Sequence, residues 1–131
     1  MQAVILAGGL GTRLGARTRD LPKALLPIAG RPFLAWLLEA LQRSGYSQVV
    51  LCIGHHGEQI RDFLGEGQPF GLDVAYSKDG ERLLGTGGAI RQALTRGLLE
   101  ESFLVTYGDS YLPFDYAAPL RDLDSHEAAL G

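Results

Sequence analysis

Three closely spaced glycines, Gly8, Gly9 and Gly11, precede Thr12 and Arg13 near the beginning of the chain. Because glycine lacks a Cβ atom, the backbone N–H groups of such a loop can approach a polyphosphate or the edge of a base closely. An arginine directly after the loop adds a rigid fork of donors that suits phosphate oxygens. The pattern favours a phosphate-binding loop over a tight turn without a ligand.

Two well-known glycine-rich loops do not fit this stretch. A P-loop requires GxxxxGK[ST], but positions 13–15 read Arg-Leu-Gly, with no Gly-Lys-Ser/Thr. A dinucleotide fingerprint requires GxGxxG and an acidic residue at the end of the second strand. Gly9 and Gly11 match its first two glycines, but Leu14 stands at the third position and the second strand ends in GHH, without a carboxylate.

Lys23 is the next candidate, since it lies between Pro22 and Pro27 in the stretch LPKALLPIAGRP. The prolines stiffen this segment and favour an ammonium group aimed inward. Without its neighbours in the sequence, Lys23 would be interpreted as a solvated loop lysine rather than as a ligand contact. Beside the glycine loop, a phosphate contact becomes the favoured interpretation.

Strands that alternate with helices must position these residues. Unbroken apolar runs predict buried strands, and helical spacing between proline and glycine boundaries predicts helices. The predicted strands span 3–7, 48–54, 72–77 and 102–109. The predicted helices span 30–45, with Pro32 in the first turn, 57–65, 85–99 and 116–123. Residues 8–28 lack helical periodicity and are predicted to be a long loop.

The apolar positions of these elements are the predicted core. They are Phe33, Leu34, Trp36, Leu37, Leu38, Leu41, Ile60, Phe63, Leu64, Ile90, Ala93 and Leu94. Tyr107 is predicted to pack within its strand, and Cys52 is predicted to be a buried, inert thiol. His55 and His56 follow the second strand, where a solvated or capping role is favoured over ligand binding.

Alternating strands and helices predict an α/β fold with a Rossmann-like, doubly wound, mostly parallel sheet. The commonest order for such a beginning is 3-2-1-4, which puts the switch point between the first and fourth strands. Ligands bind at the carboxyl ends of the strands there. Gly8 and Gly9 would therefore share a crevice with Gly108 and Asp109.

Size and charge narrow the function further. At 131 residues the chain is predicted to be one domain, 1–131. Its net charge of −3 argues against a nucleic-acid partner.

No signal peptide or stretch of about 18 apolar residues is visible, so a cytoplasmic protein without a membrane partner is expected. Four strands are few for such a sheet, so we expect an incomplete domain whose exposed apolar surface favours homo-oligomers.

Four motifs together, LAGGLGTRL, PKALLPIAGRP, LLGTGGAI and YGDS, resemble the sugar-phosphate nucleotidylyltransferases, or NDP-sugar pyrophosphorylases. The likeness is greatest to the short bacterial members that act on mannose or heptose 1-phosphates. The resemblance implies the nucleotide-diphospho-sugar transferase type of fold. It also implies condensation of an NTP with a sugar 1-phosphate, release of pyrophosphate, and Mg²⁺ as cofactor.

The resemblance also implies roles for individual residues. Arg13 would hold the β- and γ-phosphates as they leave, and Lys23 would contact the phosphates at the reacting centre. Asp109 would bind the metal. The residues implied in nucleotide binding are Leu6, Gly8, Gly9, Gly11, Thr12, Glu81, Gly85, Thr86, Gly87 and Gly88.

The implied chemistry needs no general base, because the attacking phosphate oxygen is already ionised at neutral pH. This agrees with a sequence that lacks a convincing Ser/His/Asp or Cys/His set. Two alternatives stay open. One is nucleotidyl transfer to a non-sugar phosphate acceptor, and the other is a nucleotide-binding regulatory module or a catalytically incomplete fragment.

Overall fold

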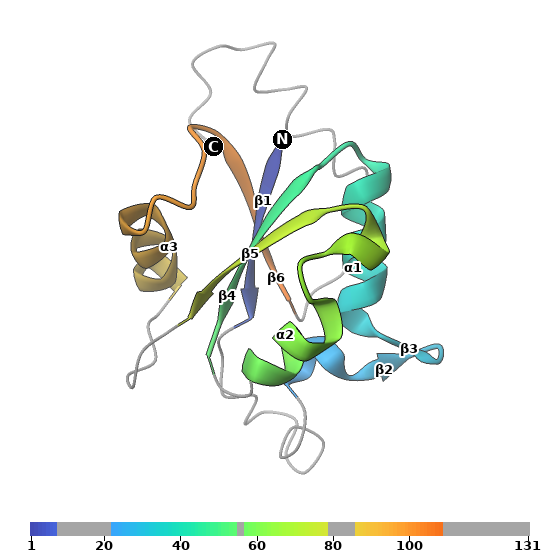
Figure 1. Cartoon of the computed structure of the whole chain (residues 1–131). Helices are drawn as coiled ribbons and strands as arrows, with labels where there is room; N and C mark the ends of the chain where they lie inside the picture. The colour runs from blue at the N-terminus through green and yellow to red at the C-terminus, as the bar shows by residue number, and fades with distance from the viewer. Residues whose placement is uncertain (8–21, 55–56, 79–85, 109–131) are drawn as a thin grey trace.

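A four-stranded parallel sheet forms the centre of the computed structural model, which describes residues 1–7, 22–54, 57–78 and 86–108 (Figure 1). Its strands are β1 (Gln2–Ala7), β4 (Gln48–Ile53), β5 (Asp73–Lys78) and β6 (Phe103–Tyr107). They lie in the order β5-β4-β1-β6, and every neighbouring pair is parallel. The predicted order 3-2-1-4 is therefore confirmed, with β1 and β6 side by side.

Helices cover both faces of this sheet (Figure 1). Helices α1 (Phe33–Arg43) and α2 (Gly57–Leu64) pack on one face, and α3 (Thr86–Thr95) packs on the other. Successive side chains of a strand point to opposite faces, and β1 shows this directly. Ala3 and Ile5 join the core with α1 and α2, whereas Val4 packs with α3. Because both faces are covered, the central strands β1 and β4 are almost entirely apolar after their first residue.

Helix α1 forms because its apolar residues recur on the side that faces the sheet. Its buried residues are Phe33, Leu34, Ala35, Leu37, Leu38, Ala40 and Leu41. The helix ends where Gly45 adopts a φ of +98°, which suits glycine at this position. Pro32 precedes the helix rather than occupying its first turn, because its extended backbone belongs to a short strand. The prediction of Pro32 in the first helical turn was wrong by one position.

The described part of the predicted long loop is ordered into small elements. A 3₁₀ turn, η2 (Lys23–Leu25), leads into β2 (Pro27–Ile28), which pairs antiparallel with β3 (Arg31–Pro32). Ala29 and Gly30 connect the two strands with φ angles of +51° and +81°. Such two-residue turns match the twist of a hairpin, but their usual sequence signal is Asn-Gly or Asp-Gly. The alanine explains why the sequence did not reveal this hairpin.

Four residues assigned to packing positions are more exposed than predicted. Phe63, Leu94 and Tyr107 are 37%, 59% and 49% exposed, and Trp36 is half-buried. Leu94 is exposed because α3 meets the sheet through the small residues Ala89 and Ala93. Tyr107 is the last residue of β6, which pairs only with β1 in the described part of the chain. The predictions for Ile60, Leu64 and Ala93 are confirmed, and Ile90 is half-buried.

Cys52 is 1% exposed, so the prediction that its thiol is buried is confirmed. None of the described helices is long and apolar enough to span a bilayer. The helix predicted at 116–123 and the residues His55 and His56 lie outside the described ranges.

Gln2 fixes β6 relative to β1. Its side chain is 3% exposed, and both ends of its amide are bonded. Nε2 donates to the Leu98 carbonyl at 2.9 Å, and Oε1 accepts from the Glu100 N–H at 2.8 Å. Since residues 98–100 join α3 to β6, Gln2 anchors this connection to the beginning of β1.

Candidate active site

The carboxyl ends of β1 and β6 meet at the switch point of the sheet. Leu6 pairs with Tyr107, and the Gly108 N–H donates to the Leu6 carbonyl at 2.9 Å. Strand β4 lies on the other side of β1, so the chain returned across β1 to add β6. The predicted adjacency of these two strand ends is confirmed. It is the position where open α/β sheets bind ligands.

Gly108 allows the two strand ends to lie this close together. A Cβ atom at Gly108 would lie 3.1 Å from Ala7 Cβ and 3.4 Å from Ile5 Cγ2. Contacts this short force neighbouring atoms to shift in a packed interior. The glycine directly before Asp109 in the sequence is thus explained by packing at the switch point.

Most residues assigned to the site from sequence lie outside the described ranges. These are Gly8, Gly9, Gly11, Thr12, Arg13, Glu81, Gly85 and Asp109. Leu6, Gly88 and the backbones of Lys23 and Thr86 are described. Leu6 ends the ladder between β1 and β6 at the switch point, where its carbonyl accepts from the Gly108 N–H.

Buried neighbours on both sides restrain the backbone at Lys23. Pro22, Ala24 and Leu25 are buried, and the last two belong to the core beneath α1. The Leu25 N–H donates to the Pro22 carbonyl at 3.0 Å, which closes η2 around Lys23. Downstream, the Phe33 N–H donates to the Leu26 carbonyl at 2.9 Å. The turn that carries Lys23 is therefore tied to the beginning of α1.

Helix α3 directs its N-terminus toward the same edge of the sheet (Figure 1). The first N–H groups of a helix lack partners within the helix, and together with the helix dipole they favour anions. Thr86 begins α3, and Gly87 and Gly88 follow in its first turn. A Cβ atom at Gly87 would meet no atom of the described residues within 4 Å, so the helix surface is open there with respect to the described part of the chain.

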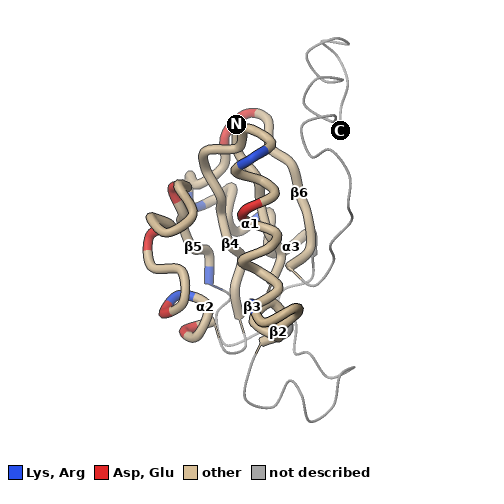
Figure 2. Tube along the Cα trace, turned by 90° about the vertical axis from the view of Figure 1, so that its right-hand side faces the viewer, with Lys and Arg blue, Asp and Glu red and all other residues tan. Residues whose placement is uncertain are grey.

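Charged groups at this edge must come from the segments that follow the strands. Strands β1, β4 and β6 contain no Lys, Arg, Asp or Glu, and the labelled traces of β4 and β6 are tan in Figure 2. Lys78 ends β5, but its Nζ atom is paired with Glu58 Oε1 at 2.5 Å. Within the described ranges, no group of three His, Cys, Asp or Glu side chains could hold a metal ion.

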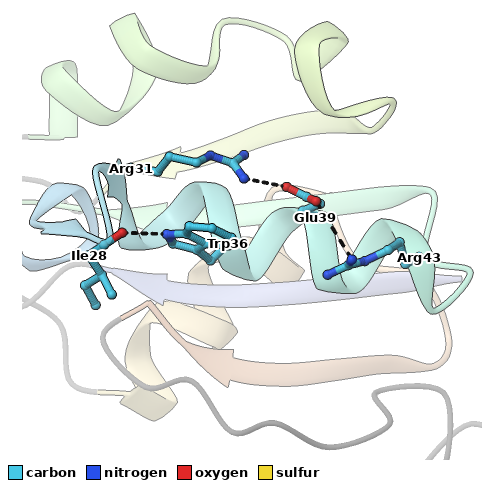
Figure 3. A network of polar contacts seen from close by, with 5 residues as sticks. All are labelled: Ile28, Arg31, Trp36, Glu39 and Arg43. Atoms are coloured by element: carbon cyan, nitrogen blue, oxygen red, sulfur yellow. Dashed lines mark hydrogen bonds and ion pairs between the residues drawn. The ribbon is translucent and has the colours of Figure 1, made fainter.

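A polar network on the outer side of α1 holds the β2–β3 hairpin (Figure 3). Trp36 Nε1 donates to the Ile28 carbonyl at 2.8 Å. Arg31 places its guanidinium 4.5 Å from the centre of the Trp36 ring and donates to Glu39 Oε2 at 2.8 Å. Trp36 was assigned to the core together with the leucines of its helix, and that assignment was wrong. Its indole N–H needs an acceptor, which the hairpin supplies at the protein surface.

Glu39 makes the stability of this network depend on pH. The hydrogen bond from Arg31 lowers the pKa of Glu39 below its usual range, and the charges of Arg31 and Arg43 act in the same direction against partial burial. A carboxylate with a lowered folded-state pKa stabilises the fold at neutral pH, and this contribution is lost as pH falls through that pKa. We expect the stability difference between the native protein and Glu39→Gln to be full above the unfolded-state pKa of about 4.3 and to shrink as pH falls from there through the lowered pKa of Glu39. Urea unfolding at each pH measures it, and a difference independent of pH would contradict the assignment.

Comparison with known proteins identifies the family. The family model described as the MobA-like NTP transferase domain matches residues 3–130. The chain belongs to this family. The N-acetylmuramate α-1-phosphate uridylyltransferase of Neisseria meningitidis is 38% identical to this MobA-like domain over 125 residues, which cover 95% of the chain and 54% of the relative. A D-glycero-α-D-manno-heptose 1-phosphate guanylyltransferase of Campylobacter jejuni is 37% identical, over 88% of the chain and 50% of the relative.

A solved structure shares both the fold and the sequence likeness. HddC from Yersinia pseudotuberculosis, complexed with GMP-PN, matches this MobA-like domain with a TM-score of 0.79 at 36% identity. The match covers 93% of the chain and 53% of HddC. The chain thus spans about half the length of the relatives described here. The predicted α/β fold of the nucleotide-diphospho-sugar transferase type is confirmed. Nucleotidyltransferases of this kind are commonly metal-dependent.

Proposed function

We propose that residues 1–131 are the nucleotide-binding part of an enzyme that transfers a nucleotidyl group from an NTP to a sugar 1-phosphate. The observation that carries this proposal is the adjacency of β1 and β6 at the switch point. The glycine loop directly follows β1 in the sequence, and Asp109 directly follows Gly108. The names of the relatives and the GMP-PN complex of HddC support the same function.

Each side of the proposed site has a separate task. Backbone groups of the loop containing Gly8, Gly9, Gly11 and Thr12 bind the nucleotide, beside the end of β1 at Leu6. Glu81 and the segment containing Gly85, Thr86 and Gly88 bind base and ribose from the side of α3. The open N-terminus of α3 and the bonded position of the Gly108 backbone are compatible with this arrangement.

The reaction joins two polyanions. A phosphate oxygen of the sugar 1-phosphate attacks the α-phosphorus, and a new P–O bond forms. The bond from the α-phosphorus to its β-bridging oxygen breaks, and the electron pair leaves with pyrophosphate. No proton has to be removed from the nucleophile, so positioned cations provide most of the stabilisation. Lys23 contacts the phosphates at the reacting centre, and Arg13 holds the departing pyrophosphate.

Mg²⁺ is the proposed cofactor, and Asp109 is its proposed protein ligand. Magnesium in such sites is held by one or two carboxylates together with substrate phosphates. A single aspartate after an uncharged strand end therefore suits this donor set. When bound, the ion would neutralise charge on the triphosphate. The use of an NTP makes the cytoplasm the expected compartment.

Pyrophosphate release tests the proposed function. GTP, UTP, dTTP and CTP are each combined with several sugar 1-phosphates, using the full-length protein that carries this chain. We expect one or a few pairs to release pyrophosphate only when both substrates and Mg²⁺ are present. Nucleotide binding without pyrophosphate in any pair would overturn the enzyme proposal in favour of a nucleotide-binding module.

A further inference from the structure

The turn that carries Lys23 and the β2–β3 hairpin form one continuous segment, 22–32, along α1. Ala24 and Leu25 anchor its first end, because both are buried in the core beneath the helix. The hairpin at its other end cannot hold itself in place. It has only two residue pairs, its residues from Pro27 to Gly30 are exposed, and isolated hairpins are marginally stable.

Trp36, Arg31 and Glu39 supply the missing anchor, and we call these three residues the α1 bracket. Trp36 reaches the β2 side of the hairpin through its bond to the Ile28 carbonyl, at 2.8 Å. Arg31 holds the β3 side, because it stacks on the Trp36 ring at 4.5 Å and bonds to Glu39 at 2.8 Å (Figure 3). Both strands of the hairpin are therefore fixed to one face of α1.

We propose that the α1 bracket positions Lys23, with Trp36 as its central positioning residue. This inference rests on the proposed role of Lys23 at the reacting centre. The core fixes one end of the segment and the bracket fixes the other, so the orientation of η2 depends on both. Loss of the bracket frees the hairpin, and the turn around Lys23 then samples orientations that do not align with the phosphates. Displacement of a catalytic group by about 1 Å can cost about 100-fold in rate.

The kcat of the Trp36→Phe variant tests this inference. The substitution keeps an aromatic ring beneath Arg31 but removes the donor to Ile28. We expect kcat to fall about tenfold, with the NTP dissociation constant changed less than about twofold. In a Lys23→Ala background the same substitution should lower kcat less than about twofold, because its effect passes through Lys23. An equal loss in both backgrounds would overturn the positioning role.

Arg43→Gln is the matched control. Arg43 approaches the same Glu39 carboxylate, but only at 3.9 Å, and its side chain is 66% exposed. Such exposed pairs contribute little, and Figure 3 joins Arg43 to Glu39 rather than to the hairpin. We expect kcat within about twofold of the native value. A loss as large as that of Trp36→Phe would show that any change on this helix face disturbs turnover, which would overturn the specific role of the bracket.

Hydrogen exchange gives a readout that does not depend on activity. The amides of Leu25 and Phe33 close the segment through their bonds to Pro22 and Leu26. In Trp36→Phe we expect these two amides to exchange about tenfold faster, while amides of β4 keep their protection. Unchanged exchange at Leu25 and Phe33 would overturn the inference. If the native protein instead releases no pyrophosphate, the proposed function fails, and the exchange result alone decides whether the bracket holds the segment.

Discussion

Lys23→Ala should lower turnover by about 100-fold or more, the scale expected for loss of one preorganised charge contact. The described backbone supports this size of effect. Lys23 lies in a turn with buried residues on both sides and bonds that tie it to α1, so its position is fixed before substrate arrives. A prealigned cation needs little rearrangement as charge develops on the phosphates. Steady-state measurement of kcat with the active NTP and sugar 1-phosphate gives the result.

Lys78→Ala is the matched control for Lys23→Ala, because Lys78 is the other lysine of the sequence. It lies at the end of β5, where it is paired with Glu58 and its side chain is 54% exposed. Exposed ion pairs contribute about 1 kcal/mol or less, so we expect less than about threefold change in kcat. A loss below tenfold in Lys23→Ala, or equal losses in both variants, would remove Lys23 from the reacting centre.

Gly67→Ala should destabilise the fold by about 2–4 kcal/mol, because backbone strain and steric overlap act together. Gly67 lies between α2 and β5, and its backbone has a φ of +93°. A Cβ atom there would lie 2.3 Å from the Leu72 carbonyl oxygen and 2.5 Å from Val74 Cγ2. The same glycine accepts a hydrogen bond from the Leu72 N–H at 3.2 Å, directly before β5. Urea unfolding gives the change in the free energy of unfolding.

Gly65→Ala is the control that separates the cost of backbone strain from the cost of steric overlap. Gly65 also has a positive φ, +57°, but a Cβ atom there would meet nothing within 4 Å. The substitution should cost about 1–2 kcal/mol, the ordinary cost of a left-handed backbone in a residue with a side chain. Equal losses at Gly65 and Gly67 would show that the predicted overlap with Leu72 is relieved by local movement.

Periodicity predicted the sheet well because its strands are covered on both faces. The runs that became β1 and β4 are unbroken apolar stretches, and their position at the centre of the sheet explains that pattern. The strand order followed from the general behaviour of doubly wound sheets, and it correctly brought the ends of β1 and β6 together.

Features that depend on neighbours distant in sequence were missed. Periodicity placed Trp36 and Leu94 in the core, but it does not reveal how wide a stripe of each helix the sheet covers. Trp36 lies at the border of that stripe, where its N–H meets the hairpin, and Leu94 lies beyond it. The hairpin itself went unpredicted because Ala29 and Gly30 are a weak turn signal and contacts with α1 hold the strands.

The candidate site, too, could be predicted only in part from the sequence. Its location at the switch point follows from the strand pattern, and the described strand ends confirm that location. The roles of Arg13, Lys23 and Asp109 follow from the family resemblance and stay predictions. The α1 bracket could not be found from sequence, since Arg31, Trp36 and Glu39 reveal their partnership only once the hairpin lies along α1.

The fate of oxygen-18 tests the central claim most directly. The protein is incubated with the active NTP and a sugar 1-phosphate that carries oxygen-18 in its non-bridging phosphate oxygens. The masses of the products are then determined by mass spectrometry. Attack of the sugar phosphate on the α-phosphorus predicts that the nucleotide-sugar keeps every label and that pyrophosphate carries none. Label in pyrophosphate, or hydrolysis of the NTP without a labelled nucleotide-sugar, would contradict nucleotidyl transfer at the switch point of this sheet.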